Sequence, residues 1–182
     1  MPWSTGPQIL YHGCDDASAI SIMTPITPNH HGINLAYSTP LTDFGLGFYT
    51  TTNLTQAKDW ANSRCLKLRM ALRGLFQPPK QVLATVLRFE VDRDEITKLQ
   101  WLSFVREDQD YWDFVQYCRT GQGPHRQTGN YDIVIGPVSL WPQKLIIKDC
   151  DQVSFHTPRS LAIVPPPIIE AQAVSYADPF LR

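Results

Sequence analysis

Two short phrases hold the residue types in this chain that are best suited to ligand chemistry: Tyr11-His12-Gly13 and Gly45-Leu46-Gly47-Phe48-Tyr49. Each lies at one end of a strand-like run. Glycine lets a ligand approach the backbone closely, so that amide and carbonyl groups become usable for recognition. The tyrosine adds an aromatic face that can stack on a cationic ring. Together the two phrases predict a pocket for a flat, charged ligand that carries phosphate and ribose oxygens.

The bulk composition is that of one ordinary globular domain. The chain has 182 residues, of which 43% are hydrophobic, and its formal net charge is −1. This composition excludes a disordered chain, and the length leaves little room for a second domain. The near-zero charge produces no field toward nucleic acid or anionic lipid, so a nucleic-acid partner would need a local basic patch.

The spacing of the cysteines and the lengths of the apolar runs indicate whether the chain binds a metal, spans a membrane or is exported. The cysteines at 14, 65, 118 and 150 form no C-x-x-C pair, so we expect no metal site and four free thiols. No apolar stretch approaches membrane-spanning length, and residues 1–4 do not begin a Sec-type signal peptide. We therefore expect a cytoplasmic protein with no membrane partner, or delivery by a dedicated secretion system.

The elements that must position these residues follow from hydrophobic periodicity. Asn53 has the place of a helix N-cap, and Gln56 completes a capping-box pattern, so a helix begins at residue 54. Between the clear elements we expect loop-rich chain over 14–43, with a short strand or turn near 20–23, and a charged turn over 92–95. The patterns predict strands over 8–12, 48–51, 82–91, 131–135 and 152–156, and helical segments over 54–75, 108–119 and 158–163. Residues 144–148 form another short apolar segment.

This order of elements predicts an α+β fold with two or three helices. Residues 1–164 form the domain, and 165–182 form a Pro-rich tail that docks, reaches a partner or stays disordered. Four basic side chains on the long helix are interpreted as a solvated face rather than a binding patch: Arg64, Lys67, Arg69 and Arg73.

Five phrases in order make the chain, from about residue 9 to 163, resemble the ADP-ribosyltransferase superfamily of the diphtheria-toxin and poly-ADP-ribose-polymerase type. Within it, the chain is most similar to a bacterial, toxin-like branch. The resemblance implies a split, mixed β-sheet core. The phrases are Tyr11-His12-Gly13, DFGLGFYTT at 43–51, QAKDWA at 56–61, YDIVIGP at 131–137 and QVSFHT at 152–157.

The resemblance also implies roles in binding and cleaving NAD. His12 would hydrogen-bond a ribose hydroxyl, the Gly13 backbone would hold the nicotinamide carboxamide, and Tyr49 would stack on the nicotinamide ring. Gln152 falls where relatives carry the catalytic glutamate, so His12, Tyr49 and Gln152 form the expected catalytic set. The expected NAD-binding residues are His12, Gly13, Gly45, Gly47, Phe48 and Tyr49.

Gln152 departs from the superfamily pattern. A glutamine accepts and donates hydrogen bonds, but it carries no charge and takes no proton. Loss of a general base costs about 10²–10⁴ in rate, and loss of a group that stabilises developing charge costs on the order of 10²–10³. Turnover would then need another carboxylate, for which Asp43 is a weak candidate, or an acceptor that is already nucleophilic.

The neighbours of these residues have plainer interpretations. Asp43 is expected to cap a turn, and His156 to be a buried structural residue. A nucleophilic Cys14 would need an activating neighbour, and we expect His12 to point to the opposite side of the strand.

The first hypothesis is therefore a toxin- or effector-like mono-ADP-ribosyltransferase. It would use NAD as substrate and pass ADP-ribose to a protein, nucleic acid or small molecule, with a neutralising or regulatory protein as a further partner. The alternatives are an NAD glycohydrolase with water as acceptor, a weak or inactive module that binds NAD or ADP-ribose, and a protein-interaction domain. In the superfamily, the loop over 138–151 would select the acceptor.

Overall fold

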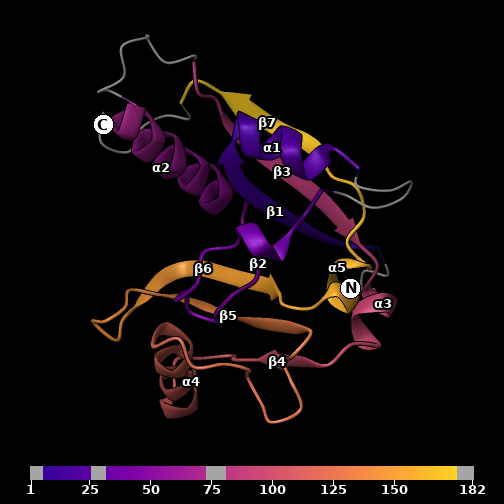
Figure 1. Ribbon diagram of the computed structural model, residues 1–182, viewed down its shortest axis with the longest axis vertical. Helices are drawn as coiled ribbons and strands as arrows, with labels where there is room; N and C mark the ends of the chain where they lie inside the picture. Colours follow the sequence, from indigo (N-terminus) through magenta and orange to yellow (C-terminus); the bar gives the residue numbers. More distant parts are fainter. Residues whose placement is uncertain (1–5, 26–31, 73–80, 176–182) are drawn as a thin grey trace, which may run out of the picture.

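Two β-sheets form the centre of the part of the chain that the computed structural model describes, residues 6–25, 32–72 and 81–175 (Figure 1). One sheet has the antiparallel order β1-β3-β7, and the other has the order β2-β6-β5-β4 with β4 parallel to β5. The α+β class expected from the sequence is confirmed. The strands are β1 (Gln8–Asp15), β2 (Phe48–Thr50), β3 (Ala84–Val91), β4 (Trp101–Ser103), β5 (Ile133–Ser139), β6 (Ile146–Phe155) and β7 (Ile168–Ala173).

The main core lies between the two sheets. Leu10 and Phe89 of the first sheet and Ile133 and Phe155 of the second are almost completely buried and belong to one cluster. Because side chains alternate along a strand, the even residues of β1 share the inner face with Leu10. His12 is one of them, so the strand that supplies core residues also carries the histidine into the space between the sheets.

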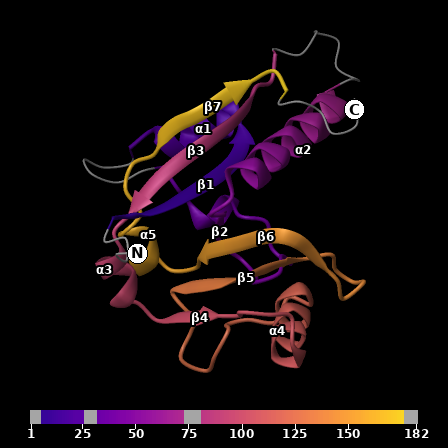
Figure 2. The same ribbon diagram turned by 180° about the vertical axis from the view of Figure 1, so that it is seen from behind.

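Helices cover the outer faces of this pair of sheets. α2 (Leu54–Leu72) lies against β1 and β3, and α4 (Gln109–Arg119) lies against the second sheet, as the opposite views in Figures 1 and 2 both show. Five α-helices occur in the described residues, more than the two or three expected. The other three are short: α1 (Asp16–Met23), α3 (Arg93–Thr97) and α5 (Pro158–Leu161). A 3₁₀ turn, η1 (Leu35–Tyr37), is also present.

Two of the short helices lie where the sequence pattern indicated other structure. α1 replaces the expected loop and short strand or turn, because Asp15 caps it by accepting a hydrogen bond from Ser18 N at 2.9 Å. α3 replaces the expected charged turn, and Asp92 caps it in the same way through Asp94 N at 2.8 Å. In both cases an N-cap side chain stabilises a short helix. Its apolar residues are too few to show the helical periodicity from which a helix is predicted.

The predicted strands occur at the expected places in the sequence, but several of them begin or end at other residues than predicted. The 144–148 and 152–156 segments belong to one strand, β6, and β5 continues through Gly136-Pro137 instead of ending there. β4 was not anticipated. Part of the expected tail, residues 168–173, forms β7 and pairs with β3. This pairing places that segment in the first sheet.

The start of α2 confirms the expected cap but not the capping box. Asn53 Oδ1 accepts from Thr55 N at 2.9 Å and from Gln56 N at 3.2 Å. The Gln56 side chain does not return to the Asn53 backbone. It is buried, donates to Asp151 O at 2.7 Å and accepts from Asp151 N at 3.1 Å, so it joins α2 to β6.

Gly13 has a structural reason to be glycine. A Cβ atom there would lie 2.0 Å from Ala57 O and 2.9 Å from Ala61 N, both in the backbone of α2. The missing side chain therefore lets the helix rest directly on β1. Packing of the helix is thus a reason for glycine at this position in addition to the close approach of a ligand expected from the sequence.

We expect Gly13→Ala to destabilise the fold by about 3 kcal/mol or more, at or beyond the upper end of usual overpacking costs, because backbone atoms cannot move aside cheaply. Chemical denaturation measures this as a lower midpoint. Gly123→Ala is the matched control, since a Cβ at Gly123 meets nothing within 4 Å. Equal midpoints for the two variants would contradict the packing described.

Candidate functional site

A hollow with a volume of about 1170 Å³ opens between the two sheets. Its walls come from β1, α1, one face of α2, β2 and the ends of β5 and β6. His12, Tyr49 and Gln152, which are far apart in sequence, all line it. The volume slightly exceeds the range of roughly 300–1,000 Å³ that is usual for small-molecule sites, so the hollow can take a ligand of dinucleotide size.

His12 is held as a neutral hydrogen-bond acceptor. Its Nδ1 lies 2.7 Å from the carbonyl oxygen of Tyr49. Because a carbonyl only accepts, Nδ1 carries the proton and Nε2 keeps a lone pair. Burial lowers the pKa of His12, although the hydrogen bond to Tyr49 opposes this effect. At neutral pH the ring can therefore accept a hydrogen bond from a ligand hydroxyl.

Gly13 presents backbone groups at an open strand edge. The backbone N–H and carbonyl of Tyr11 bond Thr51 at 2.8 and 2.9 Å, on the edge of β1 away from β3. In an antiparallel ladder every second residue points its backbone groups the same way. The amide and carbonyl of Gly13 therefore point to that same edge, beside the hollow that Gly13 lines.

Tyr49 is a fixed ring rather than an acid or a base. Its hydroxyl donates to Gly45 O at 2.7 Å, accepts from Phe44 N at 3.0 Å, and lies 2.7 Å from the Thr42 hydroxyl. Burial raises the pKa of the phenol. The hydroxyl of Tyr49 is thus engaged in hydrogen bonds that hold the 42–45 loop. The aromatic ring is the part of the side chain that is left to contact a ligand in the hollow.

Of the two glycines in the Gly45–Tyr49 motif, only Gly47 lines the hollow. Gly47 and Phe48 line the hollow, whereas Gly45 is not among the described residues that do. Gly45 adopts φ +77°, a conformation that favours glycine. Its carbonyl anchors the Tyr49 hydroxyl, so its contribution to the site is indirect. A Cβ at Gly47 would lie 2.7 Å from the His156 ring, so this residue too is fixed by packing.

Gln152 is buried and its amide is oriented by two acceptors. Its Nε2 lies 2.8 Å from Asp43 Oδ2 and 2.8 Å from Pro137 O. Asp43 is also buried and forms an ion pair with Arg119 at 2.6 Å. From the sequence, Asp43 is expected to cap a turn or to serve as a weak substitute acid. No pattern in the sequence indicated its contact with Gln152 or Arg119.

One face of α2 lines the hollow, and its bases Arg64 and Lys67 are exposed there, which agrees with a solvated face. Trp60, Arg64 and Lys67 recur at helical spacing and all line the hollow. Arg64 forms an ion pair with Asp15 at 3.3 Å, whereas Lys67 forms no ion pair among the described residues. Arg69 instead bonds the carbonyl of residue 82 at 2.7 Å, and Arg73 lies outside the described residues.

Two further groups near the site, Cys14 and His156, are buried. Cys14 lines the same hollow as His12, because residues two apart share a strand face, so the expectation that they point to opposite sides was wrong. Burial raises the pKa of the Cys14 thiol, which favours the unreactive form. His156 is buried beside the Tyr49 ring, with Nδ1 2.8 Å from Leu46 O.

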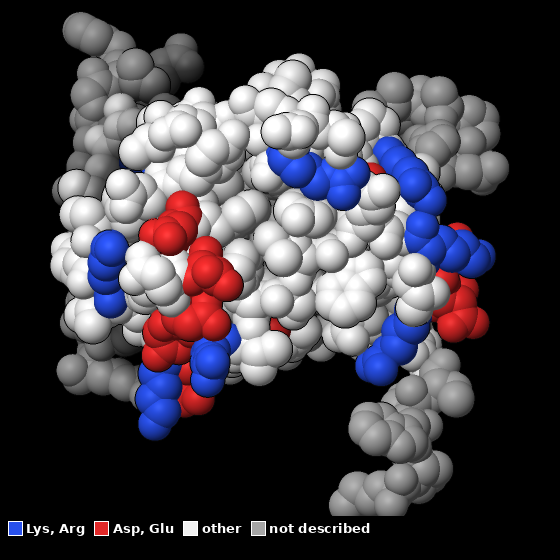
Figure 3. All heavy atoms as spheres, turned by 90° about the horizontal axis from the view of Figure 1, so that it is seen from below, with Lys and Arg blue, Asp and Glu red and all other residues white. Residues whose placement is uncertain are grey.

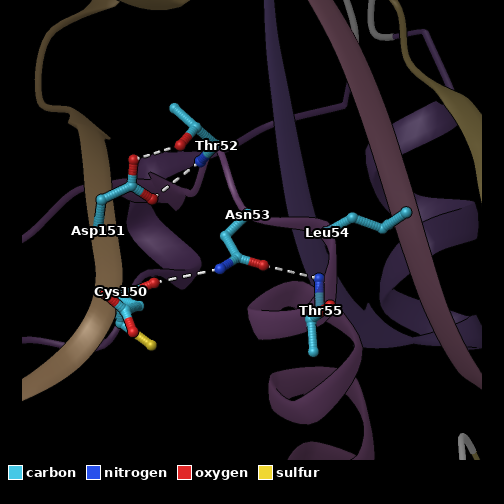
Figure 4. A pocket seen from close by; sticks show the side chains of 7 residues that line it. Thr52, Asn53, Leu54, Thr55, Cys150 and Asp151 are labelled. Carbon is cyan, nitrogen blue, oxygen red and sulfur yellow. Dashed lines mark hydrogen bonds between the residues drawn. The ribbon is translucent and has the colours of Figure 1, made fainter.

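A second hollow of about 630 Å³ lies where α2 meets β6 (Figure 4). Its polar groups satisfy one another. Asp151 accepts from Thr52 N at 2.9 Å and from the Thr52 hydroxyl at 2.6 Å, and Asn53 Nδ2 donates to Asp149 O at 3.1 Å. These bonds tie β6 to the start of α2, and we assign this hollow a structural role.

The α4 side of the molecule carries mixed charge. Figure 3 shows that Lys, Arg, Asp and Glu side chains stand in groups toward the sides of this face, with uncharged side chains over much of the area between them. Among the described residues there is no group of three or more metal-ligating side chains. Nor does any described helix have the length and apolar character needed to cross a membrane.

Comparison with known proteins gives one match. Residues 9–140 match the family model described as protein of unknown function (DUF3990). The chain belongs to this family. The matched segment includes His12, Gly13 and Tyr49, and Gln152 lies beyond it. No curated protein and no solved structure matches the chain.

Burial of His156 makes stability depend on pH. Desolvation, with the neighbouring His125 as a smaller cause, lowers its pKa from 6.5 to about 3. Between these pH values the unfolded chain binds more protons than the folded one. The stability that neutral His156 provides is therefore complete above pH 6.5 and is lost as the pH falls toward 3, with a slope of up to about 1.4 kcal/mol per pH unit.

We expect the free energy of unfolding to fall as the pH is lowered from 6.5 to 5, above the range where most carboxylates titrate. His156→Asn removes the titration but keeps an N–H for Leu46 O, so its curve should be flatter over this range while lying lower at pH 7. Denaturation at several pH values measures both curves. Parallel slopes would show that His156 does not drive the dependence.

Proposed function

We propose that the protein is an NAD-dependent mono-ADP-ribosyltransferase, toxin- or effector-like in character, on an ADP-ribosyltransferase-like fold. The observation that carries this proposal is the convergence of His12, Tyr49 and Gln152 on one hollow of dinucleotide size. These are the three residues that the resemblance assigns to NAD cleavage. The split pair of sheets, one of them mixed, is compatible with the core that the resemblance implies.

The nicotinamide end of NAD would lie between β1 and β2. The amide and carbonyl at the open edge of Gly13 can pair with the two halves of a carboxamide group, which offers one acceptor and one donor. The Tyr49 ring, fixed through its hydroxyl, can stack on the cationic pyridinium. Both contacts hold the leaving group while the bond to ribose stretches.

The ribose would meet two hydrogen-bond acceptors. His12 Nε2 and Gln152 Oε1 can each accept from a ribose hydroxyl, which fixes the sugar as it gains positive charge. Asp43, the carboxylate that contacts Gln152, is already paired with Arg119 and saturated with donors. Catalysis would therefore depend on position and on polar contacts, without a general base.

The diphosphate and adenine parts of NAD would lie along the face of α2 that lines the hollow. Lys67 and Arg64 supply positive charge one helical turn apart, which suits a diphosphate. Trp60 on the same face is 45% exposed, and Tyr37, which also lines the hollow, is 82% exposed. These are the aromatic faces available to stack on an adenine ring.

A non-catalytic module that binds NAD or ADP-ribose is the second candidate. The observation that favours it is the neutral, hydrogen-bonded amide of Gln152 in place of a carboxylate. Calorimetry with NAD and ADP-ribose, read beside turnover, separates the two functions. Binding of both ligands without release of nicotinamide over long incubation would favour the module.

Removal of the Tyr49 ring tests the enzyme. We expect Tyr49→Ala to slow nicotinamide release from NAD by about 10-fold or more, since the stacked ring and the loop anchor are both lost. Tyr49→Phe keeps the ring and should lie between Tyr49→Ala and wild type. Tyr117→Ala on α4, whose hydroxyl bonds Pro124 O, is the control. Equally slow release by wild type and Tyr49→Ala would refute the catalytic role.

A charge change on α2 tests the diphosphate contact. We expect Lys67→Ala to weaken binding of ADP-ribose by about 3- to 10-fold at low salt, and by less at high salt because the contact is screened. Lys98→Ala on α3, where Lys98 pairs with Glu95, should have no effect. Calorimetry measures both. An unchanged affinity for Lys67→Ala would remove α2 from the ligand site.

A further inference from the structure

Asp43 is the centre of a buried polar network beside Gln152. Its Oδ1 accepts from Arg119 Nε at 3.0 Å and Nη2 at 2.6 Å, and from the Ser139 hydroxyl. Its Oδ2 accepts from Ser139 N at 2.7 Å and from Gln152 Nε2 at 2.8 Å. Asp43 is 3% exposed, so five donors from three other segments meet on one carboxylate that water scarcely reaches.

This network determines which way the Gln152 amide faces. Both hydrogens of Nε2 meet acceptors, Asp43 Oδ2 and Pro137 O, each at 2.8 Å. A flipped amide would place its carbonyl oxygen against the same two acceptors and would lose both bonds. The orientation is therefore fixed by chemistry, and no described residue donates to Oε1. Since Gln152 lines the hollow, Oε1 is the amide atom left for a ligand.

We propose that Asp43 is a positioning residue, which holds Gln152 so that its carbonyl oxygen accepts a hydrogen bond from a ribose hydroxyl of the bound dinucleotide. This inference rests on the proposed function. Asp43 does not act as a general base in this scheme, because it is paired with Arg119 and donors occupy both oxygens. The carboxylate acts through the amide by fixing its orientation.

The network also explains why glutamate does not suit position 152 in this chain. Gln152→Glu would bring a second carboxylate to about the distance of a hydrogen bond from Asp43 Oδ2 and from Pro137 O. Neither partner has a hydrogen to share, and like charges at such a separation repel. The catalytic glutamate of related enzymes would therefore not restore activity here unless Asp43 changed with it.

Three variants test the proposal: Asp43→Asn, Gln152→Glu and the double exchange. Asp132→Asn is the matched control, because Asp132 is also a buried carboxylate, accepts from Gln100 N at 2.9 Å, and lies outside the hollow. At a temperature where all are folded, we expect Asp43→Asn to lower kcat for nicotinamide release about 10-fold or more with little change in KM. Asp132→Asn should keep the wild-type kcat. A folded Asp43→Asn variant with wild-type kcat would overturn the proposal.

The double exchange provides a readout that does not need turnover. In that variant the asparagine amide introduced at position 43 can donate to the carboxylate introduced at position 152. The double variant should therefore recover at least half of the melting temperature that Gln152→Glu loses. Melting-temperature losses that simply add would overturn the positioning role. A wild type that neither binds NAD nor releases nicotinamide would instead overturn the proposed function, and the coupling between positions 43 and 152 would still decide whether Asp43 orients the amide.

Discussion

One pair of backbone hydrogen bonds joins the two sheets where the candidate site forms. Tyr11 and Thr51 exchange both their N–H groups and carbonyls, and this is the isolated bridge between β1 and the chain that follows β2. Because side chains alternate along a strand, the bridge places His12 next to Tyr49, where Nδ1 meets the Tyr49 carbonyl. It also leaves the Gly13 edge open, since no further strand of the described chain pairs with β1 on that side. The tautomer of His12, the exposed peptide edge and the position of the tyrosine all depend on this contact.

A second constraint on the site comes from the buried Asp43 carboxylate. The Asp43 carboxylate joins the loop before β2 to α4, through Arg119, and to the facing strands β5 and β6, through Ser139 and Gln152. A buried carboxylate is costly unless it is paired and fully hydrogen-bonded, and here it is both. The same loop is held from the other side by the Tyr49 hydroxyl. Two of the side chains that would face the ligand, Tyr49 and Gln152, therefore share one supporting loop.

The sequence predicts the elements with long periodic patterns, whereas the strand face was assigned wrongly for His12 and Cys14, which line the same hollow. The limits of α2, α4 and β3 follow to within two or three residues where they are described, because each has a sustained apolar pattern. α1 and β4 were missed because they are short and stabilised by caps or by pairing with distant strands. The network around Asp43 has no local signal either, since its members come from four separate segments. Only the fold brings Arg119 and Gln152 to the same carboxylate.

The arrangement constrains the kind of chemistry that the proposed enzyme can perform. In a glutamate-bearing member of the ADP-ribosyltransferase superfamily, which the sequence resembles, one residue would orient the ribose, offset the positive charge of the sugar cation and assist the acceptor. Here these tasks are separated: the amide of Gln152 can orient the ribose, while the adjacent negative charge, on Asp43, is balanced by Arg119. Neither the stabilisation of the cation nor the deprotonation of an acceptor is then supplied by these residues. A productive acceptor must bring its own nucleophilicity, which favours a group that is already deprotonated over an ordinary alcohol or water.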